Sequence, residues 1–245
     1  LSINTGITHD EFHDFLVSES NKNLFLNKFL GTNFDTSYVV EGNKYYGSGF
    51  HYFSLIFELT LSKLGYFDKY SFEIKSILIK HVSVFFLFTI SGLIFKKIIK
   101  LIAQDENTAR LSTILYLFYP YLLGHSFFNV KDIPFLSIWI ILTYFNFHLI
   151  NRFIDTNIIK YREVFLFAFL SAFLISIRVS GILIFLQYLL SFIFLLNIKK
   201  ISYELIFKEI LIKLIFFIFT VYIFILLFYP IFWTNPLLLI EAIMF

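Results

Sequence analysis

The sequence predicts an all-α, polytopic transmembrane helical bundle, on the evidence of its composition, its long apolar runs and the polar turns between them. Hydrophobic residues make up 58% of the 245-residue chain, whereas soluble domains contain roughly 45–50%. The mean hydropathy is +0.79, and the apolar residues gather in runs long enough to cross a membrane. The 20 basic and 17 acidic side chains are nearly balanced, which argues against a nucleic-acid-binding protein. Because the chain has no cysteine, disulfides, thiolate metal sites and redox pairs are excluded.

Residues 1–76 are expected to form a polar loop with amphipathic helices that lie in the membrane interface. Within this loop, residues 45–67 are long enough to cross a membrane, but Glu58 and Lys63 interrupt them. We therefore interpret 45–67 as an interfacial helix and not as a span. This choice places the first 45 residues on the same side of the membrane as the turn at 124–132.

About six spans are expected in a bundle from residue 77 to residue 230. Residues 164–196 are apolar for 33 positions, apart from Arg178 and a few small polar residues. A helix of that length measures roughly 50 Å, well beyond a hydrocarbon core of about 30 Å. The sequence IRVSG at 177–181 predicts a break with two helices that meet at Arg178. Residues 231–245 are expected to be an interfacial segment that is cut short, and the chain to be a fragment of a longer protein.

The distribution of basic residues predicts the orientation of the bundle. Three connections, at 96–110, 151–163 and 197–209, would share one side and hold most of the loop Lys and Arg residues. The positive-inside rule places that side in the cytoplasm. The polar N-terminal loop, the 124–132 turn, Arg178 and the segment 229–236 would then meet on the outer side.

Four groups of polar residues are candidates for chemistry, and each has a structural alternative. Asp10 and Glu11 suit a general base and its helper, or metal ligands with His9 and His13, but their spacing alone is more typical of a solvated loop with an N-cap. Lys131 and Asp132 suit a phosphate-binding cation beside a second carboxylate, or an ordinary helix start.

Arg178 suits two-point binding of a lipid phosphate, or a side chain that reaches from the apolar run to the interface. Lys80 suits a further cation, or an interfacial anchor. His125 and Asn129 belong to the 124–132 turn, and Trp233 and Asn235 to an outer aromatic segment that is more typical of a membrane-interface belt. His51 and His148 have no partner spacing, so no role is predicted for them.

Six motifs occur in an order that is characteristic of one family: THDE at 8–11, YYGSGFHYF at 45–53, KH at 80–81, GHSFFNVKDIPF at 124–135, IRVSG at 177–181 and YPIFWTNPLLLIEAI at 229–243. With them the chain resembles the N-terminal half of dolichyl-phosphate-mannose–protein mannosyltransferase-like enzymes. These belong to glycosyltransferase family 39 and to the GT-C superfamily, which use polyprenyl-phosphate sugars.

The resemblance implies a GT-C-type bundle and a transferase of hexosyl or pentosyl groups. Asp10 and Glu11 match the acidic pair that holds the family's catalytic carboxylate, and Asp132, the third catalytic candidate, matches an acid in the second outer loop. Lys80 and Arg178 match basic positions, and with Lys131 they would bind the donor phosphate. Asp10 is the first choice for the base that deprotonates the acceptor hydroxyl in a single, inverting displacement. His125, Asn129, Trp233 and Asn235 would line the site.

The expected substrates and setting follow from the same resemblance. The donor would be a polyprenyl-phosphate sugar in a groove between helices, and the acceptor a protein, a glycolipid or a glycan; a divalent cation stays open as a cofactor. We expect an integral protein of a bacterial inner (plasma) membrane with its site facing the periplasm or exterior. A transporter or lipid flippase, or a non-catalytic membrane subunit, are the alternatives.

Overall fold

The computed structural model describes residues 7, 9–41, 43, 46–65, 67–198, 206–233 and 241, and the elements among them are all helical. The α-helices are α1 His9–Leu30, α2 Ser37–Glu41, α3 Gly49–Leu61, α4 Phe72–Ala103, α5 Glu106–Phe118, α6 Pro120–His125, α7 Asp132–Thr156, α8 Tyr161–Ile177, α9 Ile184–Ile198 and α11 Ile212–Phe228. Shorter turns of helix are η2 Ser62–Leu64, η3 Val179–Leu183, η4 Ile206–Leu211 and η5 Pro230–Trp233.

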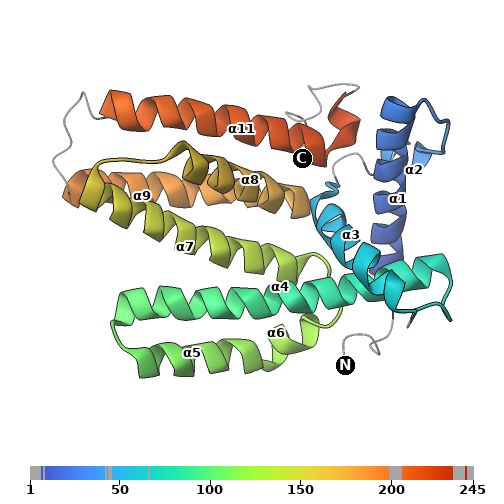
Figure 1. Ribbon diagram of the computed structural model, residues 1–245, viewed down its shortest axis with the longest axis horizontal. Helices are drawn as coiled ribbons and strands as arrows, with labels where there is room; N and C mark the ends of the chain where they lie inside the picture. Colours follow the sequence, from blue (N-terminus) through green and yellow to red (C-terminus); the bar gives the residue numbers. More distant parts are fainter. Residues whose placement is uncertain are drawn as a thin grey trace.

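The long helices lie side by side as an elongated bundle (Figure 1). In the described chain, four segments are long and apolar enough to cross a membrane, namely α4, α7, Val179–Asn197 and Glu209–Phe228. Close packing joins α4 to both α5 and α7, α7 to α8, and α8 to α11. The prediction of an all-helical bundle with membrane-length apolar helices is therefore confirmed.

We expected about six spans, and two of the expected segments form helices shorter than a membrane span. The segment 111–123 is split between α5 and α6, because Tyr119 is extended (φ −60°, ψ 119°) before Pro120 and proline disfavours a helical residue before it. Helix α8 has 17 residues, or about 26 Å, slightly less than the thickness of a hydrocarbon core.

The segment that sets the topology, residues 45–67, does not form a membrane-length helix. Helix α3 has 13 residues, about 20 Å, and it continues only into the short turn η2. Gly65 then adopts a left-handed conformation with φ 68°, which glycine accepts readily. This length agrees with the prediction that the segment does not span.

The predicted break at Arg178 is confirmed. Helix α8 ends at Ile177, Arg178 is extended (φ −147°, ψ 132°), and η3 leads into α9. Gly181 is required here, because an added Cβ would lie 2.9 Å from the backbone of Leu174.

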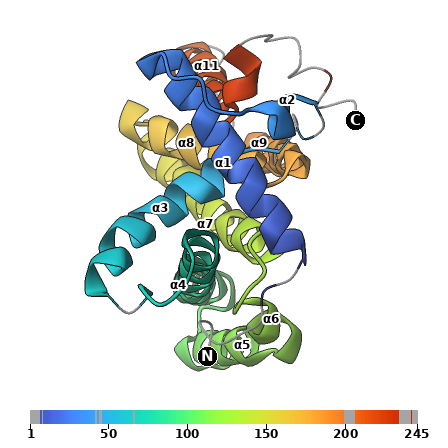
Figure 2. The same cartoon turned by 90° about the vertical axis from the view of Figure 1, so that its right-hand side faces the viewer.

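One end of the bundle is covered by α1, and we call it the α1 end. Seen from that end, α1 crosses diagonally in front of the other helices (Figure 2). Helix α4 has 32 residues, about 48 Å, and its N-terminal part projects beyond the bundle beside α1 and α3 (Figure 1). The rings of Phe25 and Phe29 on α1 pack against Trp233 of η5, with ring centroids 5.9 Å and 5.5 Å away. The C-terminal part of α1 is thus packed against η5.

Candidate functional site

The turn between α6 and α7 is held by the side chain of Asn129. Its Oδ1 accepts hydrogen bonds from the backbone N–H groups of Lys131 (3.1 Å) and Asp132 (2.8 Å). Its amide nitrogen donates to His125 Nδ1 and to Asp132 Oδ2, both at 3.1 Å. Asn129 and His125, which we expected to line a site, therefore shape the turn and position the two charged residues that follow.

Asp132 and Arg178 form an ion pair between the start of α7 and the break after α8. Both side chains are about half exposed, at 53% and 48%. The carboxylate also stands in the first turn of α7, where a negative charge is favourable. Asp132 was expected to be a catalytic carboxylate and Arg178 a phosphate ligand. The structure brings the two side chains together at the surface of the α1 end.

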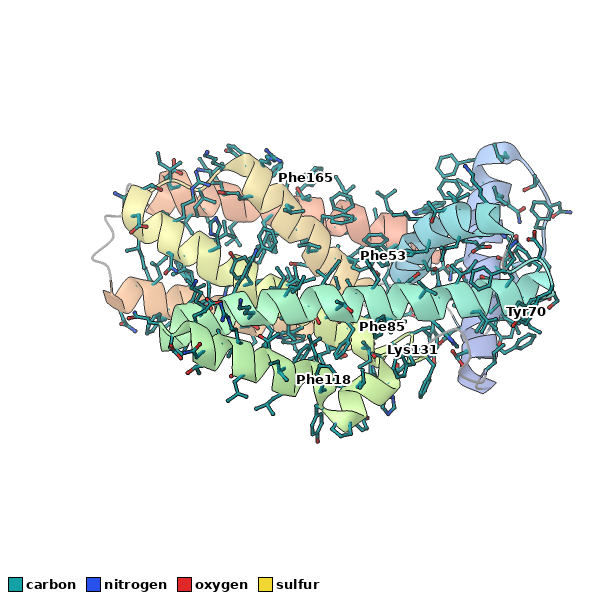
Figure 3. The ribbon with its side chains drawn as sticks, turned by 60° about the horizontal axis from the view of Figure 1, so that its bottom comes forward. Phe53, Tyr70, Phe85, Phe118, Lys131 and Phe165 are labelled. Carbon is teal, nitrogen blue, oxygen red and sulfur yellow. The ribbon has the colours of Figure 1, made fainter. Side chains whose placement is uncertain are left out.

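Lys131 turns the other way and reaches α1 (Figure 3). Its Nζ lies 2.8 Å from Asp14 Oδ1 and 4.9 Å from the ring centroid of Tyr46. Asp14 is buried, and its burial raises the pKa of the carboxyl, although the hydrogen bond and charge of Lys131 oppose this shift. Asp14 was not predicted as a site residue, and its carboxylate joins α1 to the 124–132 turn.

The acidic pair Asp10–Glu11 lies in the first turn of α1. Glu11 is buried and its Oε1 contacts Nε2 of His81, which is also fully buried. Glu11 therefore points inward and joins α1 to α4. The side chain of Asp10 lies outside the described part of the structure, as does Asn235.

Lys80 lies one residue before His81 and is also buried, at 4% exposure. Its Nζ has no hydrogen-bond partner in the described structure and lies 5.7 Å from the ring centroid of Phe15. An ammonium group buried without an acceptor is unfavourable. The resemblance implied that Lys80 binds a phosphate, and it stays a candidate for that role, although carboxylates of α1 and α3 act on its charge and it is less accessible than an interfacial anchor would be.

A small cavity of about 20 Å³ is lined by Lys131. The rest of its wall comes from four parts of the chain: Asp14 and Val17 of α1; Tyr46, Gly47, Phe50 and His51; Val130; and Ser176 and Ile177 at the end of α8. His51, for which no role was predicted, is 9% exposed and lines this cavity. Its Nδ1 has no hydrogen-bond partner among the described residues.

A much larger apolar groove of about 750 Å³ runs between α8, α9 and α11. Its walls are almost wholly aliphatic and aromatic, and they include Phe167, Phe185, Tyr188, Leu214, Val221 and Ile225. Val179, the neighbour of Arg178, lines it at the α1 end together with Tyr229 and Phe232, and Lys213 lines it farther along α11. The groove therefore reaches the part of the bundle that holds the Asp132–Arg178 pair.

Trp233 has a structural role in the described chain. Its indole N–H donates to the carbonyl of Leu226 over 2.7 Å, and its ring packs on α1. It contributes to the site by holding α1 in place.

Sequence reasoning missed Asp14, His51 and His81. Asp14 could have been found, because it follows Asp10 by four residues and so lies one helical turn away. The pairing of His81 with Glu11 joins residues 70 positions apart, and no local spacing reveals it. Among the described residues, no group of three or more His, Asp or Glu side chains is arranged to hold a metal ion.

Comparison of the chain with known protein families, curated proteins and solved structures finds no match.

Proposed function

We propose that this protein is a membrane glycosyltransferase of the GT-C type, which moves a sugar from a polyprenyl-phosphate donor to an acceptor hydroxyl. One observation carries the proposal: carboxylates, cations and one end of the apolar groove gather at the α1 end of a membrane bundle. A lipid-linked sugar phosphate needs all three.

The groove between α8, α9 and α11 suits the polyprenyl chain. Its apolar walls would solvate a hydrocarbon, and its α1 end lies beside Arg178. The phosphate would meet Arg178, whose planar guanidinium binds two phosphate oxygens at once. Lys131 and Lys80, which face α1, would add positive charge at the same end of the bundle. These charges would stabilise the phosphate as the glycosidic bond breaks.

The α1 helix supplies the carboxylates for the acceptor side of the reaction. Asp10 remains the first choice for the base that takes the hydroxyl proton, because Glu11 is occupied by His81. Attack of the hydroxyl oxygen on the anomeric carbon expels the polyprenyl phosphate with its electron pair and inverts that carbon. Asp132 would hold Arg178 at the reacting end of the groove.

The orientation follows from charge. The α4–α5 and α7–α8 connections lie at the end opposite to α1 (Figure 1), and the basic residues Lys96, Lys97, Lys100 and Arg110 flank the first of them. By the positive-inside rule, the α1 end faces the periplasm or exterior of a bacterial plasma membrane. Helices α1 and α3 would then lie in the outer interface.

The test is transfer of labelled sugar from synthetic polyprenyl-phosphate donors by the purified protein in lipid nanodiscs, with membrane extract as the acceptor source. Arg178→Met should abolish transfer, whereas Arg162→Met, at the opposite end, should retain it. Equal transfer by both variants, or no transfer from any donor, would contradict the proposal.

A lipid flippase is the second candidate, because the groove is lined both by Val179 at the α1 end and by Lys213 farther along α11. A flippase would move a fluorescent polyprenyl phosphate between leaflets of proteoliposomes without forming a glycosylated product. Translocation without product would favour this second function.

A further inference from the structure

The small cavity beside Asp14 is built by closely fitted backbone. Gly47 and Gly49 allow the segment before α3 to touch the end of α8: an added Cβ would lie 2.4 Å from the Ser176 carbonyl oxygen or 1.8 Å from Ser176 Oγ. Ser48 is fixed to the end of α11, because its N–H (3.0 Å) and its hydroxyl (2.7 Å) both donate to the Phe228 carbonyl. The position of His51, in the first turn of α3, is therefore well defined.

Two polar groups on the cavity wall have unused hydrogen-bonding capacity. His51 Nδ1 is buried and has no partner in the described structure. Asp14 Oδ1 accepts from Lys131, and the carboxylate has no second hydrogen bond from the described residues. The cavity volume of about 20 Å³ exceeds the ~10–15 Å³ that one water molecule requires. Buried polar groups of this kind are commonly satisfied by an ordered water.

We propose that this cavity holds one ordered water shared by the Asp14 carboxylate and the His51 imidazole, and that His51 acts through it as a positioning residue for Asp14. The water donates one hydrogen to Asp14 and the other to His51 Nδ1. This bond fixes the orientation of the carboxylate, which in turn holds the Lys131 ammonium. The role in catalysis rests on the proposed function, whereas the water site itself does not.

The charges around His51 favour its neutral, hydrogen-bond-accepting form. Burial lowers the pKa of His51 well below its ordinary value, and the nearby cations Lys80 of α4 and Lys131 add to this effect. Asp14 of α1 and Tyr46 also face the cavity. A neutral imidazole can accept a hydrogen from water at Nδ1 only as the Nε2–H tautomer, so the arrangement specifies one tautomer.

Nitrogen NMR of the full chain in lipid nanodiscs, with ¹⁵N-labelled histidine, tests the water site without any assay of activity. Loss of a resonance pair in His51→Gln assigns His51, and His148→Gln serves as the control on α7. We expect His51 to remain neutral at pH 6 as the Nε2–H tautomer. Asp14→Asn should shift its Nδ1 resonance and leave His148 unchanged. If Asp14→Asn destabilises the fold, Asp14→Glu, whose extra methylene fills the cavity, should shift the same resonance.

The catalytic role has a separate readout. Asp14 must be ionised to hold Lys131 in place, and water donation to Asp14 favours that form. His51→Phe should therefore move the limb of the kcat/KM pH profile that reports Asp14, as distinct from the base Asp10, upward by about one pH unit. His51→Gln, which keeps a polar group at the cavity, should restore most of the profile. If the His51 Nδ1 resonance did not shift in Asp14→Asn or in Asp14→Glu, the water site would be overturned. An unmoved pH profile would overturn the positioning role, and absence of sugar transfer by the wild type would refute the proposed function while the NMR result stood.

Discussion

The Nζ of Lys131 lies 2.8 Å from Oδ1 of Asp14, so that an ion pair joins the turn before α7 to the helix that covers the bundle. The two partners differ in burial: Asp14 is 5% exposed, whereas Lys131 is 32% exposed. Loss of the ion pair would therefore leave the buried Asp14 carboxylate without solvent, whereas the Lys131 ammonium could still be hydrated.

Lys131→Met should destabilise the protein in a pH-dependent way. At neutral pH the loss should be roughly 1–3 kcal/mol, the cost of leaving a buried acceptor unsatisfied. The folded-state pKa of Asp14 already lies above its ordinary value, and removal of the cation raises it further. Because the pKa of Asp14 is higher in the folded than in the unfolded state, its protonation favours the folded state. This contribution to stability is complete below the unfolded-state pKa of Asp14 and is lost as pH rises through its folded-state pKa.

The difference between Lys131→Met and wild type should therefore shrink as pH falls toward 4. Thermal unfolding in detergent between pH 4 and pH 8 measures it, and Lys97→Met, an exposed lysine on α4, is the control. A destabilisation of equal size at every pH would show that Lys131 does not affect the pKa of the Asp14 carboxyl.

Gly49→Ala should strongly destabilise the protein, because the new methyl group would collide with Ser176 Oγ at 1.8 Å. The segment that carries His51 would have to move away from α8. Gly124→Ala is a matched control, since nothing lies within 4 Å of an added Cβ at Gly124. Unfolding temperatures of the two variants should differ clearly, and similar values would refute the close approach of residues 47–49 to α8.

Helices α7 and α9 are joined inside the bundle by side-chain hydrogen bonds. Trp139 Nε1 donates to Gln187 Oε1 (2.9 Å), Gln187 Nε2 donates to Thr143 Oγ1 (3.1 Å), and Asn146 Nδ2 donates to Ser191 Oγ (2.6 Å). Such bonds within membranes contribute about 0.6 kcal/mol each on average.

Gln187→Leu should therefore lower stability by about 1 kcal/mol while leaving sugar transfer intact, as measured by chemical denaturation and by the transfer assay. Leu186→Ala, at a neighbouring exposed position, should have a smaller effect on stability. A large loss of activity in folded Gln187→Leu would indicate that the polar pairs take part in the reaction.

The groove offers a test of donor binding. Leu214 lines it, whereas its neighbour Ile215 does not, and both are accessible, at 47% and 61%. If the groove holds the donor as proposed, Leu214→Trp should raise KM for the polyprenyl-phosphate donor several-fold with little change in kcat, because bulk would be added where the lipid chain binds and not at the reacting atoms. Ile215→Trp should leave both constants unchanged. If Ile215→Trp raised KM and Leu214→Trp did not, the donor would bind outside this groove.

The sequence was informative where local chemistry decides the structure. The break at Arg178 follows from an arginine and a glycine inside a run too long for one span. Glu58 and Lys63 argued against a span at 45–67, and the helix found there, α3, has only 13 residues. The turn at Asn129 could likewise be located from its polar residues.

Long-range partners could not be predicted in the same way. Lys131 and Asp132 are adjacent, yet one pairs with α1 and the other with Arg178, because successive residues at a helix start point in different directions. The contact of Glu11 with His81 and the place of His51 depend on how α1, α3 and α4 pack, and composition and spacing do not encode that packing.

In the proposed mechanism, α1 and the 124–132 turn share the outer face of the membrane. The chain has no cysteine, so single cysteines can be introduced at exposed Lys28 on α1, at Gly124, where an added side chain meets open space, and at exposed Lys97 on α4. Intact cells are then treated with a membrane-impermeant maleimide. Labelling at 28 and 124 but not at 97 is the predicted result. Labelling at only one of 28 and 124, or at 97 alone, would contradict a shared outer site and remove the basis of the proposed mechanism.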